Sequence, residues 1–311
     1  MHPHLMGGFF GSATALTPAA PEVLYFAGDI QLIIVWSLLI AIVCTAIHFV
    51  LAFLLPVVFP SLQSLHNTAQ SDLLMQAMWL VTCIPLPVMY ALAMPELVAT
   101  PETRWHGHSW LVEWALMLHV GTSIYEAAMY VVYGKSWVYS VHHVIVVYAY
   151  GLGLYVGRMH VWGAWDGLVE FTNINVCILK IMLILNVGRG TPAEAINGGM
   201  LYLVYLFTRV ISLPLMLSTF AYDVLYHNEE TWQWAIRGGG FEGTRATACT
   251  LLTYSTPPCT LVIWILSCLW FLPIHRGMVK VLKGVDPLKG EKAADDLVLG
   301  NDASKVVAKQ D

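Results

Sequence analysis

The stretch IQLIIVWSLLIAIVCTAIHFVLAFLLPVVF, residues 30–59, decides the fold class because it runs for 30 residues without a Lys, Arg, Asp or Glu. The hydrocarbon core of a bilayer is about 30 Å thick, and a helix needs roughly 20 residues to cross it. Residues 30–59 are therefore predicted to span a membrane. The composition agrees, since 58% of the 311 residues are hydrophobic and 11% are charged, against about a quarter charged in soluble domains.

Six further apolar runs of comparable length follow, at residues 73–94, 111–133, 137–156, 162–187, 200–222 and 251–274. Together they predict an all-α fold, a polytopic membrane bundle of about seven transmembrane helices. Pro95 and Pro101 are expected to flank one loop, and turns are expected at 134–136 and 188–192. The chain divides into an N-terminal segment (1–28), the bundle (29–284) and a polar C-terminal tail (285–311).

Charge and cysteine usage exclude several classes of function. The formal net charge is −5 and no run of Lys or Arg occurs, so a nucleic-acid partner is not expected. The six cysteines lack CxxC spacing and are interpreted as packing residues. His2-x-His4 and His106-x-His108 each offer only two imidazoles, so they are interpreted as loop residues and no metal site is expected. Nucleotide-binding and serine-hydrolase motifs are absent from the sequence.

Basic residues predict the orientation, because Lys and Arg are retained on the cytoplasmic side of short loops. One side of the predicted membrane carries Lys135, Arg189, Arg276, Lys280 and Lys283, and the other carries Arg104, Arg158, Arg237 and Arg245. The cluster just after the last span favours a cytoplasmic C-terminus and a lumenal N-terminus.

Ionisable residues inside the spans are the informative ones, because each costs at least a few kcal/mol at the bilayer centre and should face the bundle interior. Two spans carry them at three- and four-residue spacing, which predicts one polar stripe on each helix. The stripes are His119, Thr122, Glu126, Tyr130 and Tyr133 in the third span, and Asp166, Glu170, Asn173, Cys177 and Lys180 in the fifth. The fourth span adds His142 and His143, and the sixth adds Arg209.

Imidazoles beside carboxylates in a lipid-accessible interior are suited to acyl transfer. A neutral His can act as general base, or as a nucleophile through an acyl-imidazole, while a carboxylate fixes its tautomer. Neighbouring helical residues point about 100° apart, so only one of His142 and His143 can face a given point and the other should orient, pair or stack. A purely structural alternative stays open, in which Glu170 pairs with Lys180 or Arg209 to fix helix register.

The order of these features resembles the TLC domain family. The features run from Gly121 with Tyr125-Glu126, through His142-His143 and Glu170-x-Thr172-Asn173, to Asn197-Gly198-Gly199-Met200 and Arg209. The resemblance implies a core of about six membrane helices around a cavity open to lipid. It also implies residence in the endoplasmic reticulum or another internal membrane, mitochondrial membranes included. Members include ceramide synthases, which use paired histidines to transfer acyl groups from acyl-CoA to sphingoid bases.

Several positions depart from the ceramide synthase signature. Glu170, Thr172 and Asn173 stand where that signature has Asp, Ser and Asp, whereas Lys180 is kept. Val146, Val169 and Cys177 replace a Thr, a His and a Glu of the signature. The chain is therefore more similar to the other TLC domain-containing proteins than to the synthases.

The leading hypothesis is a lipid-metabolism protein that binds a lipid or acyl chain in its bundle and transfers an acyl group. His142, His143 and Glu170 are the predicted catalytic residues; the predicted lipid-binding or supporting residues are Glu126, Thr172, Asn173, Lys180 and Arg209. No cofactor is expected, acyl-CoA being a candidate substrate, and the expected partners are membrane lipids and other membrane proteins. The alternatives are a non-catalytic accessory or cargo-binding subunit and a transporter. A catalytic site predicts one histidine of the pair within about 3 Å of a carboxylate, beside a cavity open to lipid.

Overall fold

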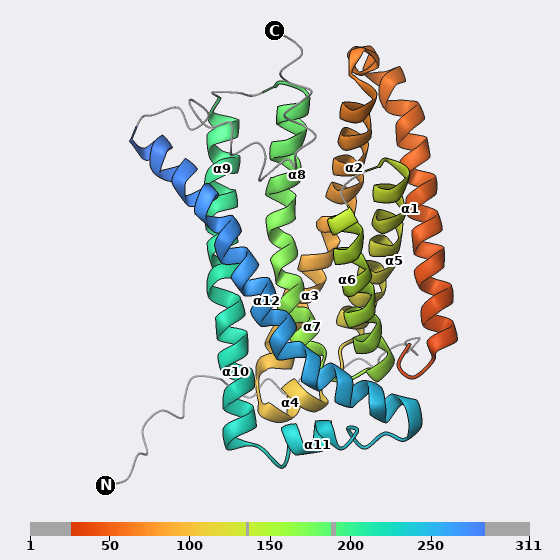
Figure 1. The fold of residues 1–311 in the computed structure, drawn as a ribbon, viewed down its shortest axis with the longest axis vertical. Coiled ribbons are helices and arrows are strands. Elements are labelled where there is room, and N and C mark those ends of the chain that lie inside the picture. The colour runs from red at the N-terminus through yellow and green to blue at the C-terminus, as the bar shows by residue number, and fades with distance from the viewer. Residues whose placement is uncertain (1–25, 135–136, 188–190, 284–311) are drawn as a thin grey trace, which may run out of the picture.

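The computed structural model describes residues 26–134, 137–187 and 191–283, which form helices and short connections without a strand. The predicted N-terminal segment up to residue 25, Lys135 and Ser136 of one turn, Gly188 to Gly190 of another, and the predicted tail 285–311 lie outside the described residues. Long helices run side by side in Figure 1, and α12 crosses them diagonally.

The elements follow one another along the chain as a series of helices. They are α1 (Ile30–Val58), η1 (Pro60–Ser64), α2 (Asn67–Cys83), α3 (Pro85–Val98), α4 (Pro101–His106), α5 (Trp110–Val132), α6 (Trp137–Val156), α7 (His160–Gly167), η2 (Leu168–Glu170), α8 (Phe171–Ile184), α9 (Pro192–Tyr205), η3 (Leu206–Ile211), α10 (Ser212–Tyr226), α11 (Trp232–Ile236) and α12 (Gly243–Leu282).

Six stretches of the described residues are long and apolar enough to cross a membrane. They are α1, α2 with α3, α5, α7 with α8, α9 with α10, and α12; in α6 the apolar part, Ser140–Val156, is shorter. The predicted polytopic helical bundle is confirmed. The loop predicted to begin at Pro95 is wrong, because Pro95 lies inside α3. Prolines are tolerated in membrane helices where neighbouring groups satisfy the freed carbonyl.

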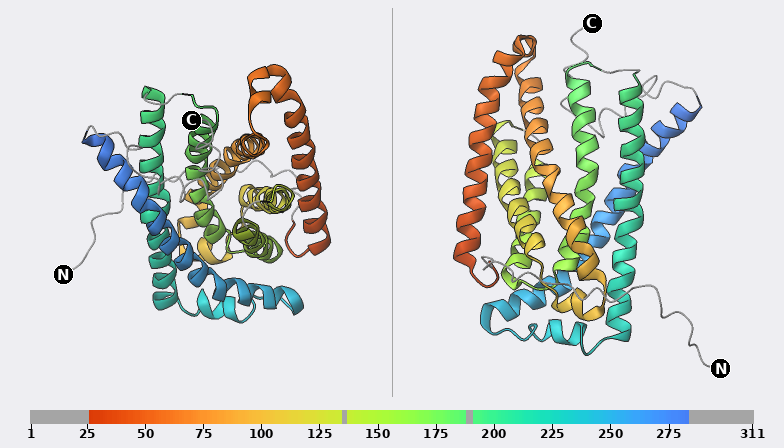
Figure 2. Two further views of the ribbon diagram at one scale, coloured as in Figure 1. Left: turned by 45° about the horizontal axis from the view of Figure 1, so that its top comes forward. Right: turned by 180° about the vertical axis from the view of Figure 1, so that it is seen from behind.

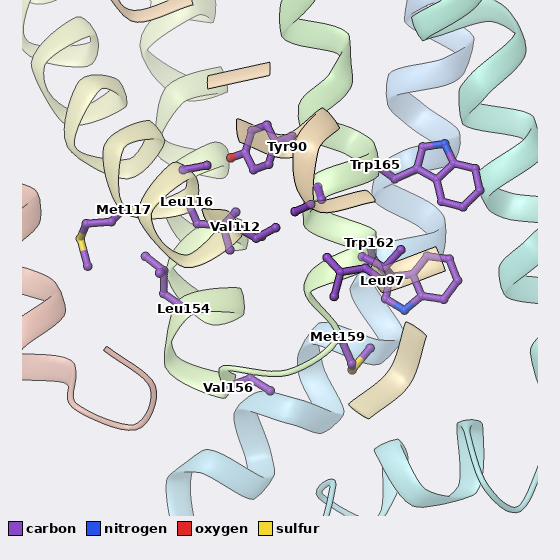
Figure 3. Close-up of a cluster of buried hydrophobic side chains, with 14 of the residues drawn as sticks. Tyr90, Leu97, Val112, Leu116, Met117, Leu154, Val156, Met159, Trp162 and Trp165 are labelled. Atoms are coloured by element: carbon purple, nitrogen blue, oxygen red, sulfur yellow. The ribbon is translucent and has the colours of Figure 1, made fainter. Parts of the chain in front are cut away.

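α5 is the central helix of the bundle. It packs against α1, α3, α6 and α7. Within an apolar stretch of 18 residues, 67% of the residues of α5 are buried, against 11% of those of α12. Gly121 allows the close approach of α1, because a Cβ atom at this position would lie 2.5 Å from the Cβ of Ile40. Figure 3 shows the buried cluster around α5, to which Leu116 of α5, Tyr90 of α3 and Trp162 of α7 belong.

The end of the bundle at α4 and α10 is held by a buried ion pair. Arg104 donates through Nε and Nη2 to the two carboxylate oxygens of Asp223, at 2.6 and 2.5 Å. The indole N–H of Trp105 donates to the same carboxylate at 3.0 Å. Asp223 has no exposed surface, so this end of the fold depends on complete pairing.

α8 stands between two groups of helices. It packs against α2 on one side and α9 on the other, as both views of Figure 2 show. Most side chains of α8 are half-buried. Of the polar stripe predicted for the fifth span, Asn173, Cys177 and Lys180 lie on α8, whereas Asp166 lies on α7 and Glu170 in η2.

Candidate functional site

The histidine pair lies on α6, and one member pairs with a carboxylate of α5. His143 Nε2 lies 3.2 Å from Glu126 Oε2, and the two residues are 7% and 8% exposed. This contact has the predicted distance between one histidine and a carboxylate. His143 also stacks on the ring of Tyr130, with centroids 5.6 Å apart and planes at 20°. α5 thus fixes His143 from two sides.

His142 differs from His143 in its surroundings. Its side chain is exposed, whereas His143 is buried, as the 100° separation of helical neighbours requires. The two rings meet edge to face, with centroids 5.2 Å apart. The second ring nitrogen of His143, Nδ1, is buried without a hydrogen-bond partner in the described part of the chain. His142 is therefore the accessible member and His143 the paired and stacked one, as predicted for two adjacent histidines.

A second network joins the predicted residues of the fifth and sixth spans. Asn173 Nδ2 donates to Glu170 Oε2 at 2.7 Å. Arg209 donates through Nε to Thr172 Oγ1 at 2.9 Å and through Nη2 to the carbonyl of Val169 at 3.3 Å. Glu170, Thr172, Asn173 and Arg209 are thus held together across α8 and η3.

Both helices are irregular where they meet. Glu170 ends the 3-10 segment η2, and Arg209 lies within the π segment η3. Such departures from α-helical geometry often mark functional positions. The ion pairs proposed as a structural alternative are not formed, because no Lys or Arg of the described residues lies within ion-pair distance of Glu170. Its carboxylate is bound by an amide instead.

The predicted residues thus form two groups of contacts. One joins His142, His143 and Glu126 on α5 and α6, and the other joins Glu170, Thr172, Asn173 and Arg209 on η2, α8 and η3. Lys180 belongs to neither group of contacts.

Lys180 faces α2 rather than the histidine pair. Its ammonium lies 5.6 Å from the ring centroid of Trp79. Trp79 in turn packs on Tyr130, with ring centroids 6.5 Å apart, so this indole lies between Lys180 and the site.

Two further histidines belong to the surroundings of the site. His119 lies 3.4 Å from the Tyr90 hydroxyl and packs on Tyr150, with ring centroids 4.7 Å apart. His48, which is fully buried in α1, hydrogen-bonds to Tyr125 at 2.8 Å through Nδ1 and to a second tyrosine through Nε2. The only sequence signal for His48 is an imidazole inside the apolar stretch 30–59.

No group of three or more metal-ligating side chains occurs in the part of the chain that the structure describes. His106 and His108 bind different partners, the carbonyl of Glu230 at 3.1 Å and the carboxylate of Glu113 at 3.2 Å, and His2 and His4 lie outside the described residues.

Two hollows occur near the site. A groove of about 310 Å³ runs between α1, α5 and α6, and a cavity of about 60 Å³ lies between α5, α6, α7 and α12. Neither is lined by His142 or His143. The predicted lipid-open cavity beside the pair therefore stays a prediction.

Comparison with known families gives one result. Residues 32–276, most of the chain, match the family model described as the TLC domain. Comparisons with curated proteins and with solved structures found no match.

Proposed function

The chain belongs to the TLC domain family, and from this premise we propose that it is an integral membrane protein that binds a lipid or acyl chain and transfers an acyl group at its histidine pair. The observation that carries the proposal is the contact of 3.2 Å between His143 Nε2 and Glu126 Oε2. Ionisable residues in a membrane bundle mark functional sites by default, and here a histidine and a carboxylate meet in the geometry of acid–base catalysis.

The exposure of the two histidines supports different roles for them in this proposal. The free nitrogen of His143 has no accessible surface, so a substrate cannot reach it. His142 is exposed beside it and is the residue that meets the substrate. Glu126 and Tyr130 hold His143, and His143 in turn holds the ring of His142. His142 is therefore the catalytic residue of the proposal, and His143 and Glu126 are positioning residues.

The proposed reaction is transfer from an acyl thioester of the acyl-CoA class to a hydroxyl or amine. Neutral His142 accepts the proton of the acceptor as its oxygen or nitrogen bonds to the acyl carbon. The C–S bond then breaks, and the proton passes from His142 to the leaving thiolate. In this proposal Arg209 stabilises the negative oxygen of the tetrahedral intermediate, and Glu170 stabilises the imidazolium.

The test is lipid mass spectrometry of membranes that contain the wild type or one variant at matched protein levels. His142→Ala should abolish the change that the wild type causes in one acyl-lipid class, because removal of a general base costs about 10²- to 10⁴-fold. Glu126→Gln should weaken the change, since an amide oxygen is a weaker hydrogen-bond acceptor than a carboxylate and would hold His143, and through it the ring of His142, less firmly. His227→Ala, at the end of α10, is the matched control and should behave like the wild type.

The opposite result favours a different class of protein. If His142→Ala stays folded and leaves the lipid profile of the wild type unchanged, acyl transfer at this site is wrong. A non-catalytic accessory or cargo-binding subunit is then the better proposal. This second candidate is supported by α12, in which only 11% of the residues of an 18-residue apolar stretch are buried in the bundle. A span that is buried so little offers surface to other membrane proteins. Affinity purification from cross-linked membranes would test it.

We also propose residence in the endoplasmic reticulum or another internal membrane, in keeping with family membership. Fluorescence microscopy of the tagged full-length chain against markers of the endoplasmic reticulum and mitochondria tests this placement.

A further inference from the structure

An apolar groove lies on the surface of the bundle between α1, α5 and α6. It has a volume of about 310 Å³, and the three helices are neighbours in the bundle (Figure 1). Its lining extends from Ile30 to Leu38 on α1 and from Val147 to Tyr155 on α6. Each of these stretches rises about 12 Å along its helix. The groove therefore follows the spans for part of their length, away from the residues proposed to act in acyl transfer.

The floor of the groove is closed and apolar, and its rim is open. Ile33 and Val120 on the floor are 4% and 3% exposed. Ser37 also lines the floor, but its hydroxyl donates to the sulfur of Met117 at 3.3 Å. The rim carries side chains that are about half exposed, namely Ile34, Leu38 and Tyr148. Because α1 is a membrane span, this opening faces the hydrocarbon of the bilayer.

Gly151 keeps space in the groove on the side of α6. It lines the groove, and a Cβ atom at this position would meet nothing within 4 Å. Glycine in a helix interior is less stable than alanine, and nothing in the packing of the described residues requires a glycine here. A larger side chain at position 151 would therefore enter the groove without a clash at its Cβ.

A guanidinium group lies at one end of the groove. The N–H of Gly28 donates to the carbonyl of Tyr155 at 2.9 Å, which joins the start of α1 to the end of α6. Arg245, in the first turn of α12, packs against this junction, because its Nη1 would lie 3.3 Å from a Cβ at Gly28. Its Nε and Nη2 donate to the carbonyl of Val156 at 3.2 and 2.7 Å. Arg245 is thus fixed beside Tyr155, the last groove residue of α6.

Arg245 has no acidic partner among the described residues. No carboxylate there lies within ion-pair distance of it, and its Nη1 makes no hydrogen bond to them. The carboxylate of Asp29 is used to cap α1, where it accepts the N–H of Leu32 at 2.9 Å. Arg245 is also partly exposed. Since α1 and α12 begin here and α6 ends here, its free N–H groups lie where a bilayer has its headgroups.

We propose that this groove binds a membrane phospholipid, with one acyl chain along α1 and α6 and the phosphate at Arg245. The apolar walls match the hydrocarbon chain, and an arginine with free N–H groups is suited to phosphate oxygens. A hydrocarbon chain alone would leave the guanidinium without an anion, and a free anion would leave the groove empty. The lipid stays intact, so its binding does not depend on acyl transfer at His142.

Site-resolved cross-linking tests the proposal. The full-length protein in detergent micelles is irradiated with a phosphatidylcholine that carries a diazirine in one acyl chain, and labelled peptides are identified by mass spectrometry. Peptides that contain residues 30–38 and 147–155 should be labelled. Unlabelled dioleoylphosphatidylcholine should compete at about a tenfold lower concentration than dioleoylglycerol, which has the same chains but no phosphate. Tenfold is the difference between a charged and a neutral hydrogen bond.

Variants separate the groove from the guanidinium. Gly151→Leu should abolish most of the labelling of both peptides, because its side chain fills the groove. Gly198→Leu on α9 is the matched control, since a Cβ there also meets nothing within 4 Å, and it should be labelled like the wild type. Arg245→Gln should raise the half-competing concentration of dioleoylphosphatidylcholine about tenfold. That of dioleoylglycerol should stay unchanged, which shows that the groove is still formed.

Two kinds of result would overturn the proposal. If the peptides of α1 and α6 are not labelled, or are labelled equally in Gly151→Leu, something other than this lipid occupies the groove, such as another part of the chain. If dioleoylglycerol competes as well as dioleoylphosphatidylcholine, or if Arg245→Gln behaves like the wild type, the phosphate is not bound at Arg245.

Discussion

Replacement of Asp223 by Ala is expected to destabilise the bundle by about 4 kcal/mol. Its fully buried carboxylate accepts two hydrogen bonds from Arg104, at 2.6 and 2.5 Å, and one from the Trp105 indole at 3.0 Å. Without Asp223, the Arg104 side chain, which is 10% exposed, stays charged and unpaired. Breaking a buried pair in this way costs about 3–5 kcal/mol. The orphaned indole N–H places the loss above the lower end of that range.

The measurement is equilibrium unfolding in mixed micelles, followed by tryptophan fluorescence. The control is the double variant Arg104→Met with Asp223→Leu, which removes both charges together. It should lose only about 1–3 kcal/mol, for the indole N–H that stays unpaired, because exchange of a whole buried pair for apolar residues is often neutral. A free energy of unfolding for Asp223→Ala within about 1 kcal/mol of the wild type would refute the reasoning, as would a double variant less stable than the single one.

Two further predictions concern α1 and its neighbours. Gly121→Ala should lower the free energy of unfolding by about 1–3 kcal/mol, because the new Cβ would lie 2.5 Å from the Cβ of Ile40. The control Gly198→Ala, where a Cβ meets nothing within 4 Å, should be neutral or stabilising. Equal free energies of unfolding for the two variants would contradict this prediction. His48→Phe should lower the free energy of unfolding by about 1–3 kcal/mol, because it leaves two tyrosine hydroxyls without their imidazole partner. Tyr133→Phe removes one of these hydrogen bonds and should lower it less in the same assay. The reverse order would show that packing rather than hydrogen bonding dominates.

The membrane helices could be predicted from the sequence because their signal is local. Residues 30–59 were predicted as a span and form α1, Ile30–Val58. α6 has the predicted bounds, 137–156, but its apolar part is shorter than those of the six spans. The contact between the histidine pair and a carboxylate could also be predicted. Glu126 and His143 lie on consecutive helices with a short connection, and a buried charge must find a partner. Which of the two histidines would pair depended on the rotation of α6, which the sequence does not determine.

The helices that Asp166 and Lys180 contact could not be predicted from the spacing of the polar stripe. Asp166 and Lys180 are 14 residues apart, which is about 21 Å along a helix. At such a separation two residues on one stripe meet different neighbours. Asp166 contacts α12 through Thr260, whereas Lys180 faces α2. The pairing of Arg104 with Asp223 spans 119 residues and leaves no local signal.

The same irregular turns explain how Arg209 and Glu170 can be held close to one segment without pairing with each other. In a 3-10 segment the backbone bonds run from i to i+3, so carbonyls at its end can accept side-chain donors. Arg209 in the π segment donates to one of them, that of Val169, and to Thr172. The guanidinium of Arg209 is thus held by neutral oxygens, without an ion pair among the described residues. The Glu170 carboxylate in turn accepts the Asn173 amide.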